Sequence, residues 1–128
     1  MSAIAFQPVA ECGETSQQQA QAYHRRWLVA NDAGTWLTRA LCPRLAEVST
    51  ELRLGYLVIK APGMLRMDIP LDVIEDDDSV RYQILIGEQT VDVVDEGDLA
   101  AAWLSNFVQL PCRLLKVHPD MEAVRWPA

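Results

Sequence analysis

Short stretches in which apolar and polar residues alternate, separated by turn-forming residues, make up most of the sequence. Alternation with a period of two is typical of strands that bury one face. Turn residues at 31–34 and 87–88 join neighbouring stretches as hairpins. About eight or nine short strands at this spacing predict a mainly β fold, an antiparallel barrel that closes on itself and leaves few exposed edges. The candidate strands cover residues 3–9, 23–32, 35–38, 49–54, 56–61, 64–71, 80–87, 89–95 and 112–118.

One stretch near the C-terminus has the periodicity of a helix instead. It covers about residues 97–108, and Asp98 is its expected N-cap. Leu99, Trp103 and Phe107 recur at positions i, i+4 and i+8, which predicts a single apolar stripe on one helix face. We expect this helix to cover one opening or one face of the barrel.

The length and charge of the chain limit its class. The 128 residues fit one domain, which we expect over 1–118, followed by a tail, 119–128, that is a candidate flexible segment. The net charge of −7 argues against nucleic acid and against an anionic membrane surface as partners. The acidic run 75–79 lacks the alternating ligands and the glycine of a calcium loop, so we interpret it as a solvated loop. Because the N-terminus has no signal-peptide pattern and no apolar run reaches about 20 residues, the expected location is the cytoplasm.

The residue types that carry catalysis are sparse. Cys12, Cys42 and Cys112 are odd in number and far apart, which argues against a disulfide framework and favours small buried side chains. His24 and His118 have no evident partner for acid–base work, and with two histidines and no CxxC pair we expect no metal site. No glycine-rich phosphate loop and no GxSxG elbow occurs. The sequence therefore predicts no catalytic residue.

Arginines are the more informative charged residues. In a strand, Arg25 would share a face with Trp27 and Val29, while the next residue, Arg26, would lie on the opposite face. Both faces are apolar, so at least one guanidinium is expected in a half-buried place. Four arginines are the candidate residues for binding an anion or a partner: Arg25, Arg26, Arg39 and Arg44. The alternative is that they pair with surface carboxylates, where each pair contributes about 0–1 kcal/mol.

Several stretches together resemble the N-terminal β-barrel domain of MOSC proteins. They are RRWLVANDAGTWLT, PRLAEV, APGM and GEQTVDVVDEGDLAAAWLSNFVQLPCRLLKV, and the resemblance extends over nearly the whole chain. In that family the barrel usually precedes a MOSC domain, which carries the molybdenum cofactor on a cysteine. The mitochondrial amidoxime-reducing components have this layout. The resemblance implies a barrel fold and places Arg25 near the position of a cofactor phosphate.

The chain departs from the family where the cofactor is held. Family members with cofactor chemistry have a Pro-Val-Lys-Ser run, and here the matching run is PVAE, with Ala10 and Glu11 in place of the lysine and the serine. His24 replaces an aspartate, and Arg39 stands one position early. Ala10 and Glu11 are therefore degenerate cofactor-site positions. An internal ion pair between Glu11 and Arg25 is the expected substitute for the phosphate.

The resemblance and its departures together predict a function. Because the sequence ends without room for a MOSC domain, we expect a stand-alone, non-catalytic binding or interaction module without a cofactor. It would serve as an accessory to an oxidoreductase, and its expected partner is a separate MOSC-domain or oxidoreductase polypeptide. Three alternatives stay open: part of a split molybdenum-cofactor enzyme completed in trans by a MOSC domain, a small-anion-binding protein, or a domain that now has an unrelated structural role. The sequence does not indicate the oligomeric state.

Overall fold

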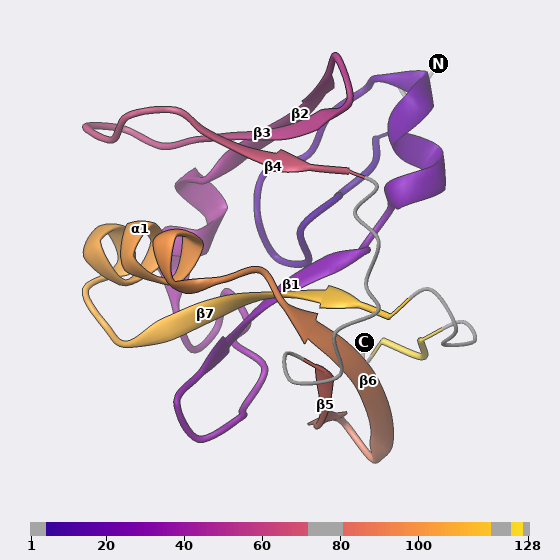
Figure 1. The fold of residues 1–128 in the computed structure, drawn as a ribbon, viewed down its shortest axis with the longest axis vertical. Helices are drawn as coiled ribbons and strands as arrows, with labels where there is room; N and C mark the ends of the chain where they lie inside the picture. The colour runs from indigo at the N-terminus through magenta and orange to yellow at the C-terminus, as the bar shows by residue number, and fades with distance from the viewer. Residues whose placement is uncertain (1–4, 72–80, 119–123, 127–128) are drawn as a thin grey trace.

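The computed structural model describes residues 5–71, 81–118 and 124–126, which form two antiparallel sheets with one α-helix between them (Figure 1). The larger sheet has the strand order β1-β7-β6-β5, and the smaller sheet has the order β2-β3-β4. All the strand pairs are antiparallel, as the alternation predicts. The strands are β1 (Trp27–Asn31), β2 (Ser49–Arg53), β3 (Tyr56–Lys60), β4 (Met67–Pro70), β5 (Arg81–Ile86), β6 (Gln89–Asp95) and β7 (Cys112–Val117).

The two edge strands of the larger sheet, β1 and β5, are connected through the segment at 35–36. The segment after β1 turns back at 31–34, and Trp36 forms an isolated bridge with Ala30 of β1. The neighbouring Thr35 forms a parallel bridge with Leu85 on the edge strand β5. Backbone pairings therefore run from β1 through β7, β6 and β5 and return to β1, which gives the barrel character that the sequence predicts. The stretch expected as a strand at 35–38 contributes only these bridges.

Strand β1 lies between two separate clusters of buried residues, and this position explains why both of its faces are apolar. Trp27 and Val29 belong to a cluster that also includes residues of the small sheet and of α1. Leu28 and Ala30 belong to a second cluster inside the curled sheet. In the C-terminal segment, Trp126 packs against this second cluster. Of the tail predicted at 119–128, the structure describes residues 124–126, of which Val124 and Trp126 pack against this cluster.

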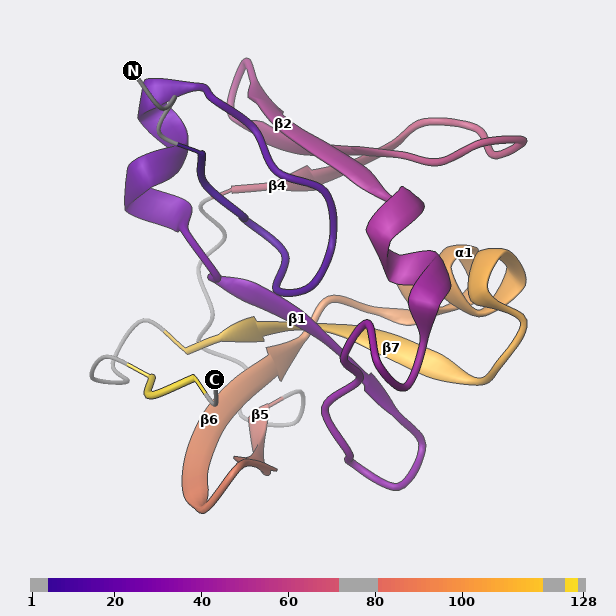
Figure 2. The same cartoon turned by 180° about the vertical axis from the view of Figure 1, so that it is seen from behind.

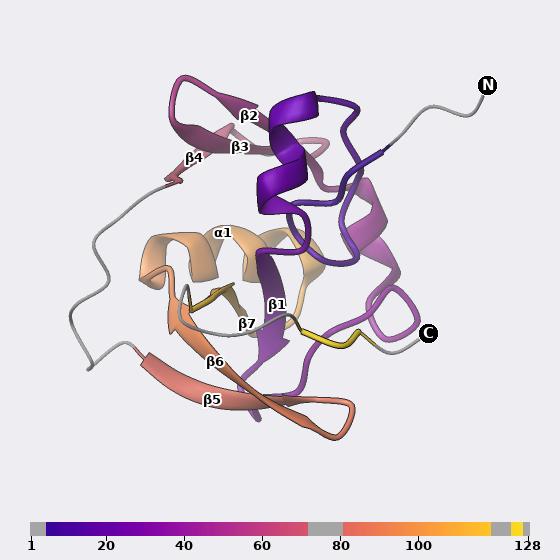
Figure 3. The same cartoon turned by 90° about the vertical axis from the view of Figure 1, so that its right-hand side faces the viewer.

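Helix α1 (Asp98–Val108) lies between the two sheets and packs against β7 (Figures 1 and 3). The predicted apolar stripe of Leu99, Trp103 and Phe107 is not the buried face of this helix, because Leu99 is 84% exposed. The buried face consists of Ala100, Ala101, Leu104, Phe107 and Val108.

The start of this helix also differs from the prediction. Gly97, with a φ of 109°, occupies the N-cap position, whereas the sequence predicts Asp98 there. Asp95 accepts a hydrogen bond from the Gly97 N–H at 2.8 Å. Asp98 instead pairs with Arg113 of β7 at 2.6 Å, and Asp95 also pairs with Arg113. The helix is therefore fixed to the large sheet by charge as well as by packing.

The N-terminal part is less strand-like than the alternation suggests. Residues Gln18–Tyr23 form a 3₁₀ helix, η1, and strand β1 begins only at Trp27 (Figure 2). Arg25 has a φ of 52°, which breaks the strand geometry assumed for the arginine pair. Residues 3–9 contribute only isolated bridges at Phe6 and Val9 in the described part of the chain.

Two further expectations concern short segments. A short 3₁₀ helix, η2, covers Pro43–Glu47. The acidic run 75–79 lies outside the described residues. Among the residues that the structure describes, no helix has the length and apolar character needed to span a bilayer.

Candidate functional site

A tight turn at residues 8–12 forms the base of the candidate site. The side chain of Gln7 clamps it: the amide oxygen accepts a hydrogen bond from the Glu11 N–H at 2.8 Å, and the amide nitrogen donates to the Cys12 carbonyl at 3.1 Å. The Ala10 N–H donates to the Trp27 carbonyl at 2.8 Å, which ties the turn to the start of β1. Glu11 has a φ of 71°, a left-handed conformation that these bonds maintain.

Arg39 fixes the same turn from the loop that follows the β1 hairpin. Its Nε donates to the Glu11 carbonyl at 2.8 Å, and its Nη2 donates to the Cys12 carbonyl at 2.7 Å. The Arg39 backbone N–H also donates to Oε1 of Glu11 at 3.3 Å. Because two donors of this guanidinium are used on backbone carbonyls, Arg39 is a structural part of the site.

Arg25 lies on the other side of Glu11. Its Nη2 is 3.9 Å from Oε2 of Glu11, so the structure confirms the expected ion pair. Its backbone N–H donates to the Gln7 carbonyl at 2.7 Å, which holds the residue in its left-handed conformation. The guanidinium carbon lies 5.0 Å from the ring centroid of Trp126, a cation–π distance. The Arg25 side chain is 23% exposed and that of Glu11 is 21% exposed, so both side chains are half-buried.

His24 is a neighbour of this site, and its contacts are structural. Its Nδ1 accepts a hydrogen bond from the Gln7 N–H at 2.9 Å, and its ring meets Phe6 edge-on at 6.2 Å. Burial lowers the pKa of His24, and the charge of Arg25 lowers it further. A neutral ring that accepts at Nδ1 carries its proton on Nε2, so His24 adds no positive charge beside Arg25 at neutral pH.

The other two predicted arginines lie elsewhere. Arg26 takes part in backbone hydrogen bonds with Tyr23 and Val117 at the start of β1. Arg44, in η2, pairs with Glu47 at 3.4 Å, and its guanidinium lies over the ring of Phe107 at 4.2 Å. The structure thus brings Arg25 and Arg39 together around Glu11, whereas Arg44 belongs to the contact between η2 and α1.

Two residues of the site are absent from the prediction made from the sequence. Gln7 is a buried polar side chain, but an isolated glutamine before a proline gives no recognisable signal. Trp126 was assigned to the flexible tail, although a tryptophan in a polar tail is itself a sign of a packed segment. Trp126 also meets Trp36 edge-on, with 5.0 Å between the ring centroids.

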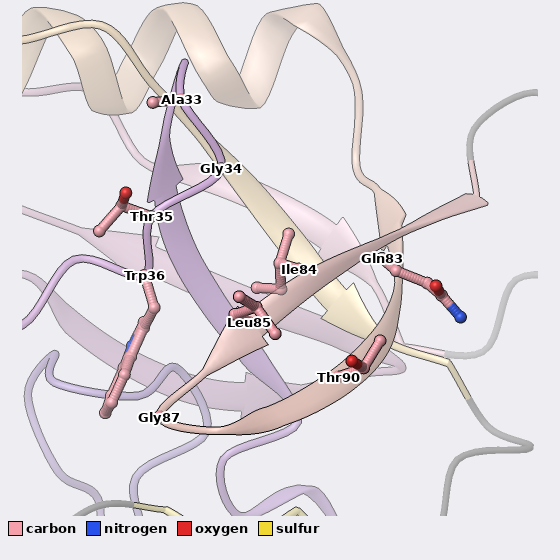
Figure 4. Close-up of a pocket in the computed structure, with 9 residues that line it drawn as sticks. All are labelled: Ala33, Gly34, Thr35, Trp36, Gln83, Ile84, Leu85, Gly87 and Thr90. Atoms are coloured by element: carbon pink, nitrogen blue, oxygen red, sulfur yellow. The ribbon is translucent and has the colours of Figure 1, made fainter.

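A pocket of about 650 Å³ lies between the loop at 33–36 and strand β5, and Trp36 is one of the residues that line it (Figure 4). Its lining has no charged side chain, and it includes Thr35, Leu85 and Thr90. Nε1 of Trp36 is buried without a hydrogen-bond partner in the described part of the chain. A second pocket of about 620 Å³, lined by Leu65, Leu99 and other mostly apolar residues, lies between α1 and the turn that joins β3 to β4. Neither pocket is lined by Arg25 or Glu11.

The cysteines do not provide a reactive group. Cys12, Cys42 and Cys112 are all buried and unpaired. Burial raises the pKa of Cys12 to about 12, even though the nearby charge of Arg39 lowers it in part. Burial also raises the pKa of Cys112. Among the described residues, no three histidine, cysteine or carboxylate side chains are grouped so that they would hold a metal ion.

The curled antiparallel sheet, the second small sheet and the single covering helix define the chain as a small β-barrel domain. A sequence model described as the MOSC N-terminal beta barrel domain matches residues 4–111. The chain therefore belongs to the MOSC N-terminal β-barrel domain family, and the resemblance stated from the sequence is confirmed.

Individual relatives agree with this assignment. Human molybdenum cofactor sulfurase is 33% identical over 100 residues, which cover 77% of this chain and 11% of that protein. Mitochondrial amidoxime reducing component 2 of Bos taurus is 26% identical over 115 residues, which cover 89% of this chain and 34% of that protein. The chain thus spans about a tenth to a third of the length of these two relatives. A Bordetella bronchiseptica protein with a solution structure is 76% identical, with a TM-score of 0.84, and the match covers 100% of this chain and 98% of that one.

The residues present do not fit the molybdenum cofactor that the family implies. Ala10, at the position of the expected lysine, is completely buried against the second cluster and offers no cation. Glu11, at the position of the expected serine, places a carboxylate beside Arg25, where a phosphate would meet like charge. Arg39 is used on the turn itself.

Proposed function

We propose that this chain is a non-catalytic binding module that accepts an anionic group at Arg25. One observation carries the proposal: the half-buried side chain of Arg25, which is 23% exposed, donates no side-chain hydrogen bond within the part of the chain that the structure describes. Its contact with Glu11, at 3.9 Å, is too long for a hydrogen bond. A half-buried cation is stabilised further when its N–H donors meet an acceptor, so the Arg25 donors that no described residue uses favour an external acceptor.

Two other arginines give the comparison. Arg113 donates to both Asp95 and Asp98, and these hydrogen bonds raise its pKa above its usual range. Arg39 donates to two backbone carbonyls at 2.8 and 2.7 Å. These two guanidinium groups with structural roles are thus well hydrogen-bonded. Among the described residues, the Arg25 guanidinium instead contacts the ring of Trp126 and, at 3.9 Å, the carboxylate of Glu11.

The proposed source of the anionic group is a separate polypeptide. Two of the relatives that match are a molybdenum cofactor sulfurase and an amidoxime reducing component, and in both the matching region is a minor part of a longer chain. These relatives support an accessory role beside an oxidoreductase, with a separate MOSC-domain or oxidoreductase polypeptide as partner. The split-enzyme alternative is less well supported, because Ala10 and Glu11 do not fit the cofactor.

Titration of the isotope-labelled full chain tests the anion site. We expect acetate and phosphate each to shift the Arg25 side-chain Nε–H signal and the Trp126 indole N–H signal with a saturable dependence on concentration. Arg25→Gln should abolish this response. Arg44→Gln, which removes the same charge from an exposed arginine with its own partner, is the matched control and should leave the response intact.

Two results would overturn the proposal. One is a wild-type chain with no saturable response, or with the same response after Arg25→Gln. The other is stoichiometric molybdenum in protein expressed with cofactor biosynthesis intact, which would support the split enzyme instead. The partner is tested by calorimetry, in which oxidoreductase or MOSC-domain polypeptides encoded beside this chain are titrated into the wild type and into Arg25→Gln.

A further inference from the structure

We infer that Glu11 is an internal competitor for the Arg25 site, and that it makes the site prefer singly charged carboxylates to doubly charged phosphate. This inference deepens the proposed function and depends on it. A ligand that binds Arg25 must take the place of the Glu11 carboxylate or lie beside it. The class of ligand therefore depends on how firmly the Glu11 carboxylate is held and on the net charge of Arg25, Arg39 and Glu11 together.

The backbone of Glu11 is fixed, whereas its carboxylate is held weakly. Gln7 accepts from the Glu11 N–H, and Arg39 donates to the Glu11 carbonyl, so the turn does not depend on the side chain. The carboxylate contacts are long: 3.3 Å from the Arg39 N–H and 3.9 Å from the Arg25 guanidinium. Rotation about the side-chain torsions of Glu11 therefore releases Arg25 without unfolding the turn.

The charges favour a monoanion. Arg25 and Arg39 contribute two positive charges and Glu11 contributes one negative charge, which leaves a single positive charge at the site when His24 is neutral. One carboxylate balances this charge. A doubly charged phosphate leaves an excess negative charge close to Glu11, and like charges at this range repel.

The shape of the site agrees with the charge. The Trp126 ring covers one face of the Arg25 guanidinium, so a ligand on that side is excluded and binding in the plane of the guanidinium is favoured. A planar carboxylate accepts two parallel hydrogen bonds in this plane. The carboxylate of an aspartate, a glutamate or a chain end of a partner protein has the same chemistry as a free small carboxylate.

Glu11→Gln tests the inference, because it removes the charge and keeps an oxygen that accepts from the Arg39 N–H. Acetate and phosphate are titrated into the wild type and the variant at a pH where phosphate is a dianion. Removal of one like charge should strengthen acetate binding about fivefold and phosphate binding about 25-fold, so the preference for acetate should fall. Glu14→Gln, a neighbouring exposed charge change of the same kind, should leave this preference nearly unchanged.

The outcomes separate the two claims. If the wild type binds acetate through Arg25 and Glu11→Gln alters neither affinity nor preference, the inference on Glu11 is wrong and the proposed function stands. If neither chain binds either anion, the proposed function fails and the inference with it. Binding that appears only in Glu11→Gln, and is lost in Glu11→Gln combined with Arg25→Gln, would support the internal competitor and overturn anion binding by the natural chain. An acidic peptide that competes with acetate would identify a protein as the source of the carboxylate.

Discussion

Two leucines of helix α1 allow a direct test of which helix face is buried. Leu104 is 1% exposed and lies in the cluster between the two sheets, whereas Leu99 is 84% exposed. Leu104→Ala removes buried apolar atoms and leaves a cavity, which costs about 3–5 kcal/mol. Leu99→Ala leaves no cavity and replaces leucine by a slightly better helix former, so the free energy of unfolding should change by less than about 0.5 kcal/mol.

Urea and thermal unfolding, followed by far-ultraviolet circular dichroism, measure both changes. A loss of this size should lower the melting temperature of Leu104→Ala by about 10 °C or more, because a domain of this length loses several degrees per kcal/mol. Leu99→Ala should have the same melting temperature as the wild type. If Leu99→Ala is destabilised as strongly as Leu104→Ala, the helix packs through the stripe of Leu99 and Trp103, and the packing argued above is wrong.

Two further substitutions test other parts of the fold. Gly13→Ala would place a Cβ 2.8 Å from the Val48 carbonyl oxygen, so we expect overpacking to lower the free energy of unfolding by about 1–3 kcal/mol, measured in urea. An unchanged midpoint would show that the 8–12 turn shifts freely against Val48. The raised pKa of Cys12, about 12, means that the folded chain keeps this proton after the unfolded chain has lost it, so stability should fall as the pH rises above the ordinary thiol value of 9.0. Urea midpoints across this range should fall less steeply for Cys12→Ala, and equal slopes for the two chains would contradict the assignment.

The strands were predictable where local pattern and tertiary contacts agree. The hairpin of β5 and β6 around Gly87 follows from alternation on both sides of a turn residue, and the structure pairs these strands residue by residue. Around Gly55 the sequence predicts a strand on each side, at 49–54 and 56–61, and the structure pairs these strands as the hairpin of β2 and β3. In both cases the period of two and a turn residue indicate where the strands begin and end.

The phase of the helix was not predictable from spacing alone. Leu99, Trp103 and Phe107 form one regular stripe, while Leu104 and Phe107 belong to another that is completed by alanines. Both stripes include Phe107, and hydrophobicity alone favours the one with larger side chains. The structure buries the face that carries Ala100, Ala101 and Leu104, and the helix packs against β7.

The candidate site was predictable in part. The resemblance led to Arg25 and Glu11, and the ion pair between them followed from the need to balance a buried charge. The backbone at Arg25 was not predictable, because a left-handed conformation in an arginine comes from a distant hydrogen bond to the Gln7 carbonyl and not from its neighbours in sequence. The contact with Trp126 joins residues a hundred positions apart, which no local pattern reveals.

Strand β1, with one face in each buried cluster, also determines how the molecule comes apart. Trp27 and Leu28 are adjacent in sequence, yet each is completely buried in a different cluster. Neither half of the protein can open at β1 without exposing the apolar side chains of the other half to water. Melting should therefore be a single cooperative event, and the amide hydrogens of β1 and β7 should be the slowest in the described chain to exchange with solvent deuterium.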